Sequence, residues 1–153
     1  MRFLFVDRIL ALVPGRSVEA EHVFDPGEDF FRDHFPGFPV VPGVLLAEMM
    51  GQAAALCLNA ESRDTGRGKA MLAQIRSASF REWVRPGEKV TIKAEIRSSQ
   101  AGCATASCSA EVGGRRVCAA DLLFTFLPLA DFAPGIRDEV LETYLASRPG
   151  GKG

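Results

Sequence analysis

The sequence lacks several features, and each shortage excludes a class of function. The net charge is -1 at pH 7, whereas a nucleic-acid-binding domain usually carries a basic excess. None of the four cysteines belongs to a Cys-x-x-Cys pair, so we expect reduced, partly buried thiols and no metal site. Asp7 and Arg8 interrupt the apolar start of the chain. We therefore expect neither a signal peptide nor a membrane span, and we predict a cytoplasmic protein.

The residues that are present suit one folded domain. The length of 153 residues and the hydrophobic fraction of 47% are enough for a single core. Alternating or continuous apolar patterns predict six strands, over residues 5–12, 18–24, 71–83, 90–97, 104–112 and 115–127. One long apolar segment, residues 43–59, predicts a helix. A single helix followed by a strand meander indicates an α+β fold, with a sheet of about six antiparallel strands wrapped on the helix.

The predicted helix carries only two polar residues through its middle, Glu48 and Gln52. A helix that is apolar all round is buried, and a carboxylate inside it has to be paired, protonated or in contact with cavity water. The two residues are four apart and share one face, so Gln52 can hold the Glu48 carboxyl in position. The alternative is a stripe of two polar residues that faces solvent.

The loop before this helix contains a histidine and three prolines. It reads His-Phe-Pro-Gly-Phe-Pro-Val-Val-Pro-Gly from His34 to Gly43. Proline fixes φ, so such a loop loses little entropy in holding a base in one position, and imidazole titrates near neutrality. The N–H of Gly43, at the helix start, is a candidate donor to an oxyanion. These groups suit proton abstraction next to a carbonyl, although a lone loop histidine is often only structural.

The block from His34 to Gln52 resembles the signature of the 3-hydroxyacyl-acyl-carrier-protein dehydratases of the FabZ type, within the FabZ/FabA-like family. The likeness extends over about residues 5–127, and includes the Phe-Val-Asp-Arg-Ile opening and the Arg-Pro-Gly turn at 85–87. It implies a hot-dog fold, in which a curved sheet wraps one long central helix. It also implies a lyase of fatty-acid or related lipid biosynthesis that needs no cofactor and no metal.

The resemblance further implies roles for single residues. His34 would remove the C2 proton of a 3-hydroxyacyl thioester, Glu48 would protonate the departing 3-hydroxyl, and the Gly43 N–H would hold the thioester oxygen. His34 of one subunit and Glu48 of another would meet in one site of a homodimer, which can assemble further into a hexamer. The partner would be acyl carrier protein, bearing an acyl chain on phosphopantetheine. Candidates for the acyl tunnel are Phe35, Phe38, Pro39 and Val40.

Other readings stay open. The chain could be a hot-dog hydratase or thioesterase acting on coenzyme A thioesters, or a non-catalytic acyl-thioester binding module. His22 lies on the apolar face of its strand, and we expect a satisfied structural histidine there. A basic rim for an acidic carrier protein, or simply a solvated surface, would be formed by Arg76, Arg81, Arg85 and Lys89.

The end of the chain exceeds the hot-dog pattern. We divide the sequence into a hot-dog dehydratase domain at residues 1–130, a helical extension at 131–146 and a flexible tail at 147–153. The extension carries Phe132, Ile136, Val140, Leu141 and Tyr144 near helical spacing. A helix of this length is marginal alone in water, so we expect its apolar stripe to dock on its own domain or on a neighbouring subunit. The alternative is a flexible tail.

Overall fold

The computed structural model describes residues 1–131 and 138–147. Within this part the helical elements are η1 (Asp29–Arg32), α1 (Gly43–Thr65), η2 (Leu129–Asp131) and α2 (Glu139–Ser147). The strands are β1 (Arg8–Val13), β2 (Ser17–Val23), β3 (Lys69–Phe80), β4 (Lys89–Ser99), β5 (Cys103–Val112) and β6 (Arg115–Leu127). The predicted order of two strands, a loop, a long helix and four strands is therefore confirmed.

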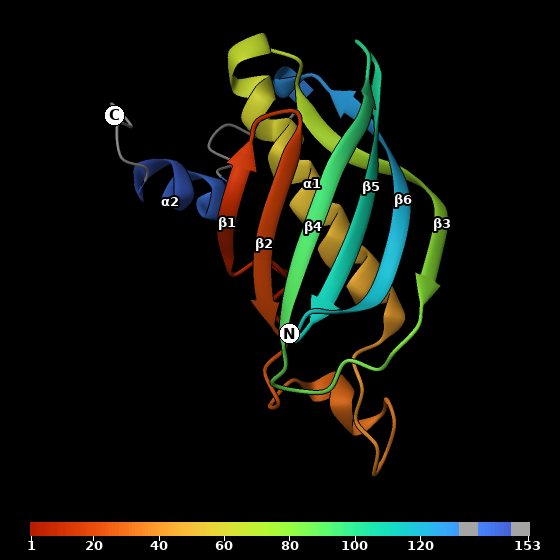
Figure 1. Cartoon of the computed structure of the whole chain (residues 1–153). Helices are drawn as coiled ribbons and strands as arrows, with labels where there is room; N and C mark the ends of the chain where they lie inside the picture. The colour runs from red at the N-terminus through yellow and green to blue at the C-terminus, as the bar shows by residue number, and fades with distance from the viewer. Residues whose placement is uncertain (132–137, 148–153) are drawn as a thin grey trace.

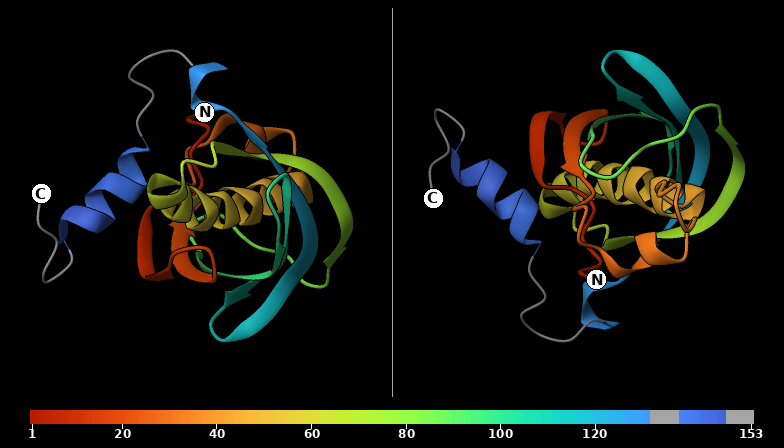
Figure 2. Two further views of the ribbon diagram at one scale, coloured as in Figure 1. Left: turned by 90° about the horizontal axis from the view of Figure 1, so that it is seen from above. Right: turned by 90° about the horizontal axis from the view of Figure 1, so that it is seen from below.

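The strands form one antiparallel sheet in the order β1-β2-β4-β5-β6-β3. The sheet curves around α1, while the N-terminal segment and η1 lie on the other side of this helix (Figures 1 and 2). β1 and β3 are the two edge strands of the sheet. Register shifts at Leu72/Gln74 and Ile75/Ser77 interrupt the pairing of β3 with β6, and such bulges bend a strand.

α1 is longer than the sequence pattern predicted. It continues past Asn59 to Thr65 and ends with three exposed polar residues, Arg63, Asp64 and Thr65, which an apolar pattern does not include. Gly66 ends the helix in the left-handed conformation, with φ 68° and its N–H bonded to Ser62 O at 2.8 Å. By length and composition α1 could cross a membrane, but 67% of its most apolar window is buried inside the fold. The core therefore accounts for its apolar character.

The first strand begins later than predicted. Phe5 and Val6 are buried but belong to no strand, and β1 starts at Arg8. We call residues 3–6 the N-terminal strap. The segment after it is fixed to β2: the Asp7 N–H donates to Glu21 O at 2.9 Å, and the Asp7 carboxylate lies 2.9 Å from Nδ1 of His22. His22 is buried and paired, which agrees with its predicted structural role.

Side chains of β5 alternate strictly between buried and half-exposed positions, as predicted from the sequence. Its inward residues are small, so the sheet can approach α1 closely. Three of the four cysteines are buried, and all four are free thiols. Burial raises the pKa of Cys57 to about 11, that of Cys108 to about 12 and that of Cys118 to about 11. These thiols are therefore protonated, and so poorly nucleophilic, at neutral pH.

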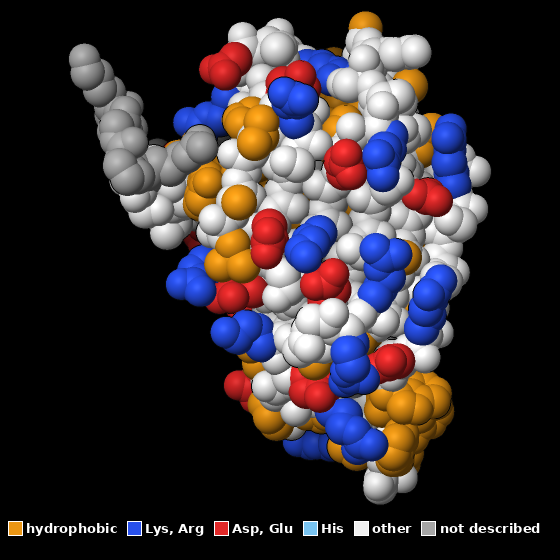
Figure 3. Space-filling view, in the orientation of Figure 1, with side chains coloured by type: hydrophobic (Ala, Val, Ile, Leu, Met, Phe, Trp, Pro, Cys, Tyr) orange, Lys and Arg blue, Asp and Glu red, His pale blue; other side chains and the backbone are white. Residues whose placement is uncertain are grey.

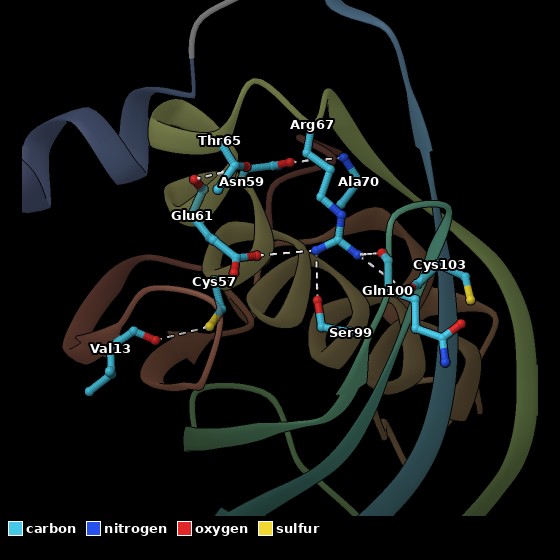
Figure 4. A network of polar contacts seen from close by, with 10 residues as sticks. All are labelled: Val13, Cys57, Asn59, Glu61, Thr65, Arg67, Ala70, Ser99, Gln100 and Cys103. Atoms are coloured by element: carbon cyan, nitrogen blue, oxygen red, sulfur yellow. Dashed lines mark hydrogen bonds and ion pairs between the residues drawn. The ribbon is translucent and has the colours of Figure 1, made fainter.

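One arginine joins the far end of α1 to the sheet (Figure 4). The Arg67 guanidinium pairs with Glu61 at 3.2 Å and donates to Ser99 Oγ at 2.6 Å and to the Cys103 carbonyl at 3.2 Å. It also donates to the carbonyl of Gln100 and lies 3.9 Å from the centre of a β6 phenylalanine ring. A single cation, with most of its side chain covered, thus ties the helix end to the β4–β5 hairpin and to β6.

The C-terminal extension docks on its own chain in the part that is described. Leu141 of α2 is buried, and Val140 and Tyr144 pack against the core. Ion pairs join Glu142 to Arg63 at the end of α1 and Asp138 to Lys69 at the start of β3. The helix is shorter than the predicted span, beginning at Glu139. Phe132 and Ile136, like most of the predicted tail, lie outside the described residues.

Candidate active site

The loop after η1 fixes both the position and the tautomer of His34. Its backbone N–H donates to Phe30 O at 3.0 Å, and its carbonyl accepts from the Val40 N–H at 3.1 Å. Nδ1 of the ring lies 3.1 Å from the Val40 carbonyl oxygen. Because a carbonyl can only accept, Nδ1 carries the proton, and Nε2 of the neutral ring is left as a proton acceptor. The loop therefore holds His34 as an oriented base.

The same loop leads into the N-terminus of α1. The Val41 N–H donates to Val84 O at 2.8 Å, which anchors the loop to the segment after β3. Gly43 follows the N-cap residue Pro42, so its N–H has no intrahelical acceptor. A Cβ on Gly43 would lie 3.3 Å from the Phe80 ring. Glycine at this position thus lets the Phe80 ring of β3 lie against the N-terminus of α1.

Glu48 lies on the second turn of α1, half-buried, and is held by Gln52 one turn later. The Gln52 amide nitrogen donates to Glu48 Oε1 at 3.1 Å. The predicted pairing of these side chains is present, and the alternative of a free solvent-facing stripe does not describe them. Gln52 also bonds to the N-terminal strap, through the Phe5 N–H at 2.8 Å. Sequence reasoning missed this partner, because Phe5 is 47 residues away.

Within one chain, His34 and Glu48 have different bonding partners. Among the described residues, no hydrogen bond or ion pair joins the two side chains. Two surface hollows of about 710 Å³ each are lined by other residues. Of the tunnel candidates, Phe35 and Phe38 are exposed, Pro39 is half-buried, and Val40 is buried with its carbonyl on His34. In one chain the half-buried side chains of His34 and Glu48 therefore form no directly bonded acid–base pair.

Unusually exposed apolar side chains surround these parts. Val44, in the first turn of α1, is 75% exposed, and Ile75 and Phe80 of β3 are 47% and 48% exposed. Trp83 and Phe38 meet edge to face at the end of the molecule that carries the η1–α1 loop. Figure 3 shows hydrophobic side chains gathered at that end, beside Lys and Arg. Such a patch next to candidate catalytic groups indicates a surface that a partner covers.

Known sequences resemble the chain over most of its length. The FabA-like domain family matches residues 1–121. A protein named 3-hydroxyacyl-[acyl-carrier-protein] dehydratase FabZ from Levilactobacillus brevis is 39% identical over 121 residues, covering 79% of this chain and 81% of the relative. A protein of the same name from Lactiplantibacillus plantarum is 38% identical, covering 79% of this chain and 82% of the relative. Another, from Wolbachia of Brugia malayi, is 36% identical, covering 79% of this chain and 84% of the relative.

Solved structures share the fold at low identity. A hypothetical thioesterase with coenzyme A from Streptococcus pneumoniae superposes with a TM-score of 0.62 at 14% identity, covering 79% of this chain and 85% of that chain. The N33D mutant of a phenylacetic acid degradation protein PaaI from Thermus thermophilus superposes with a TM-score of 0.60 at 20% identity. The match covers 78% of this chain and 92% of that chain. At this identity the likeness shows architecture alone. The architecture is the predicted hot-dog fold, with a long helix wrapped by a curved antiparallel sheet.

Proposed function

The chain belongs to the FabA-like family, and we propose that it dehydrates 3-hydroxyacyl thioesters on acyl carrier protein to trans-2-enoyl thioesters. This hydro-lyase reaction is a step of fatty-acid biosynthesis. The observation that carries the proposal is an oriented base at His34 and a half-buried, hydrogen-bonded carboxyl at Glu48, both inside the matched residues. An oriented base and a positioned acid are the pair that elimination of water next to a carbonyl requires.

In the proposed reaction each group has one task. Nε2 of His34 takes the C2 proton, and the C2–H electron pair forms the C2=C3 double bond as the C3–O bond breaks. Glu48, protonated at the start, gives its proton to the departing hydroxyl, which leaves as water. The N–H of Gly43 binds the thioester oxygen, where negative charge develops as the C2 proton leaves. Atoms and charge balance without a cofactor.

We place the complete site between two copies of the chain, supported by the exposed edge. Beyond Ala70, every residue of β3 is exposed, although this strand is long and carries apolar side chains. An open strand edge of this kind is a template for pairing with another strand. Pairing of β3 with β3 of a second copy would join two sheets and cover Ile75 and Phe80. It would also let His34 of one copy approach Glu48 of the other.

The carrier would approach over the basic and aromatic surface near the η1–α1 loop. Arg85 lies with its guanidinium carbon 4.6 Å from the centre of the Phe38 ring, and Arg81 is exposed nearby in the chain. Acyl carrier proteins are acidic, so exposed arginines at the entrance would attract them and raise the association rate. Phosphopantetheine would then extend from this surface toward Gly43.

The test is a turnover panel on the purified chain. Substrates are 3-hydroxyacyl and trans-2-enoyl thioesters, each on acyl carrier protein and on coenzyme A, with water loss or addition followed by absorbance of the conjugated thioester. We expect reversible dehydration, fastest on the carrier protein. Hydrolysis of the thioester, or faster turnover on coenzyme A, would favour the other hot-dog activities and contradict the proposal.

Two inactive variants test the shared site. His34→Ala should lower kcat by about 10² to 10⁴, the range typical of losing a general base or acid, while the fold is retained. Glu48→Gln should do the same. Mixed dimers of the two variants contain one site with both groups intact, so subunit exchange should restore up to about a quarter to a half of the activity, depending on the fraction of mixed dimers. No recovery, with exchange confirmed by native mass spectrometry, would reject a site shared between subunits.

A further inference from the structure

The amide of Gln52 makes three hydrogen bonds. Its oxygen accepts from the backbone N–H of Phe5 at 2.8 Å. Its nitrogen donates to Glu48 Oε1 at 3.1 Å and lies 3.5 Å from the carbonyl oxygen of Phe3. Two of these partners belong to the N-terminal strap and one is the candidate catalytic carboxyl. The strap and Glu48 are therefore linked through a single side chain.

The chemistry of the strap decides which way this amide points. The oxygen and nitrogen of a glutamine amide have nearly the same shape, so only the partners distinguish its two orientations. A backbone N–H can only donate, so the atom facing Phe5 has to be the oxygen. A backbone carbonyl can only accept, so the atom facing Phe3 has to be the nitrogen. Both strap groups thus impose the same orientation, with an N–H directed at Glu48.

The strap itself is held rigidly enough to impose this choice. Phe5 is 2% exposed, and its ring packs against Phe3 and Phe24 with centroids 4.9 and 5.5 Å away. Asp7, immediately after the strap, is fixed to β2 by the Val23 N–H at 2.9 Å and by His22. The strap carries no titratable side chain. The charged groups flanking it are engaged elsewhere: Asp7 with His22, and Arg2 with Glu139 of α2.

We propose that the N-terminal strap, through the Phe5 N–H, orients Gln52 so that it donates to Oε1 of Glu48 and leaves the transferable proton on Oε2. This rests on the proposed function of Glu48 as the acid. In a protonated carboxyl the carbonyl oxygen is the better acceptor, so an N–H directed at Oε1 favours the hydroxyl at Oε2. Phe5 and Gln52 are positioning residues in this arrangement, and Oε2 is the atom that meets the 3-hydroxyl of the substrate.

The sharpest test removes the Phe5 N–H and keeps every side chain. Replacing Phe5 with phenyllactic acid puts an ester in place of the amide and keeps the ring. Only the longer 3.5 Å contact with the Phe3 carbonyl then still favours the original orientation. Gln52 can therefore turn its oxygen toward Glu48, which favours the protonated carboxyl and directs its proton at Gln52 instead of the substrate. We expect kcat to fall about 10- to 100-fold, the scale of one hydrogen bond to a charged group, with KM nearly unchanged. The limb of the pH–rate profile that reports Glu48 should move to higher pH.

Gln52→Met, which keeps the length of the side chain without its amide, should reproduce both effects. In this background the ester should cause no further fall in kcat, because both changes break the same link. The matched control is phenyllactic acid at Phe124, a fully buried residue of the central strand β6 that pairs with Leu72 of β3 and Ala104 of β5. It should lower the melting temperature without moving the pH profile.

Two results would overturn the inference. In the first, the ester at Phe5 has the same kcat and pH profile as the parent protein. In the second, the ester lowers kcat in the Gln52→Met background by the same factor as in the parent, so that the two effects multiply. A measurement that does not depend on catalysis separates failure of this inference from failure of the proposed function. The side-chain amide signals of Gln52 should follow the titration of Glu48 in the parent protein, and should lose or reverse that response in the ester. Amide signals that ignore pH in the parent would also reject the inference, whatever reaction the protein catalyses.

Discussion

Arg67→Met removes a mostly covered cation while keeping most of the apolar stem, so it tests how the C-terminal end of α1 is held to the sheet. The Arg67 side chain is 12% exposed, and its partner Glu61 is 31% exposed. Breaking a buried ion pair costs about 3–5 kcal/mol. Glu61 is partly exposed, and Arg67 Nε has no hydrogen-bond partner in the described part of the chain. The expected loss of stability therefore lies at the lower end of this range. We predict a loss of about 3 kcal/mol in the free energy of unfolding.

The loss of Arg67 also removes its hydrogen bonds to Ser99, Gln100 and Cys103 at the β4–β5 hairpin, which should loosen that end first. A loss of about 3 kcal/mol corresponds to a fall of roughly 6–12 °C in melting temperature for a chain of this size. Urea titration followed by circular dichroism measures the free energy directly. The matched control is Arg97→Met, whose ion pair with Glu95 is solvent-exposed on both sides and should change stability by under about 0.5 kcal/mol. If the two variants are equally stable, the reasoning about Arg67 is wrong.

Four further predictions concern the sheet edges, α2 and the cysteines. Ile75→Lys should shift the protein from dimer to monomer in sedimentation, whereas Val13→Lys on the opposite edge strand, at a position of similar exposure, should not. Leu141→Ala should lower stability by about 2 kcal/mol in thermal unfolding, because its buried side chain anchors α2; an unchanged melting temperature would make α2 a passive tail. The buried thiols have raised pKa values of about 11 to 12 in the folded protein. From about pH 9 upward the thiols of the unfolded chain therefore lose their protons, while those of the folded chain keep them. Stability should therefore fall as pH rises from about 9 toward 12, and serine variants at those positions should weaken that fall; in native alkylation Cys103, which is not buried, should react first.

Local chemistry in the sequence was enough to predict the main parts of the site. Three prolines around His34 indicated a stiff loop, and the loop does hold the ring by its own Val40 carbonyl, six residues away. The pairing of Glu48 with Gln52 followed from a spacing of four on a helix. Both are contacts within a few residues, where backbone geometry alone fixes which groups meet.

Element boundaries were less predictable where tertiary contacts override the pattern. Phe5 and Val6 continue an apolar strand pattern, yet they pack as the strap instead of pairing in the sheet. β3 alternates too weakly to show that nearly all of it is exposed. In each case the apolar residues indicate that a segment is buried or that a partner covers it, but they do not indicate which part of the structure it packs against.

By itself the sequence determined the composition of the core, the single long helix, the stiff loop before it and the residues able to carry acid and base. Only the tertiary structure decided that Phe5, 47 residues before Gln52, sets the direction of its amide, and that Arg67 joins a helix end to a hairpin more than thirty residues away. Periodicity describes which side of an element is apolar. Contacts between distant residues depend on how the sheet curves around α1, and that curvature comes from the packing of all its strands together.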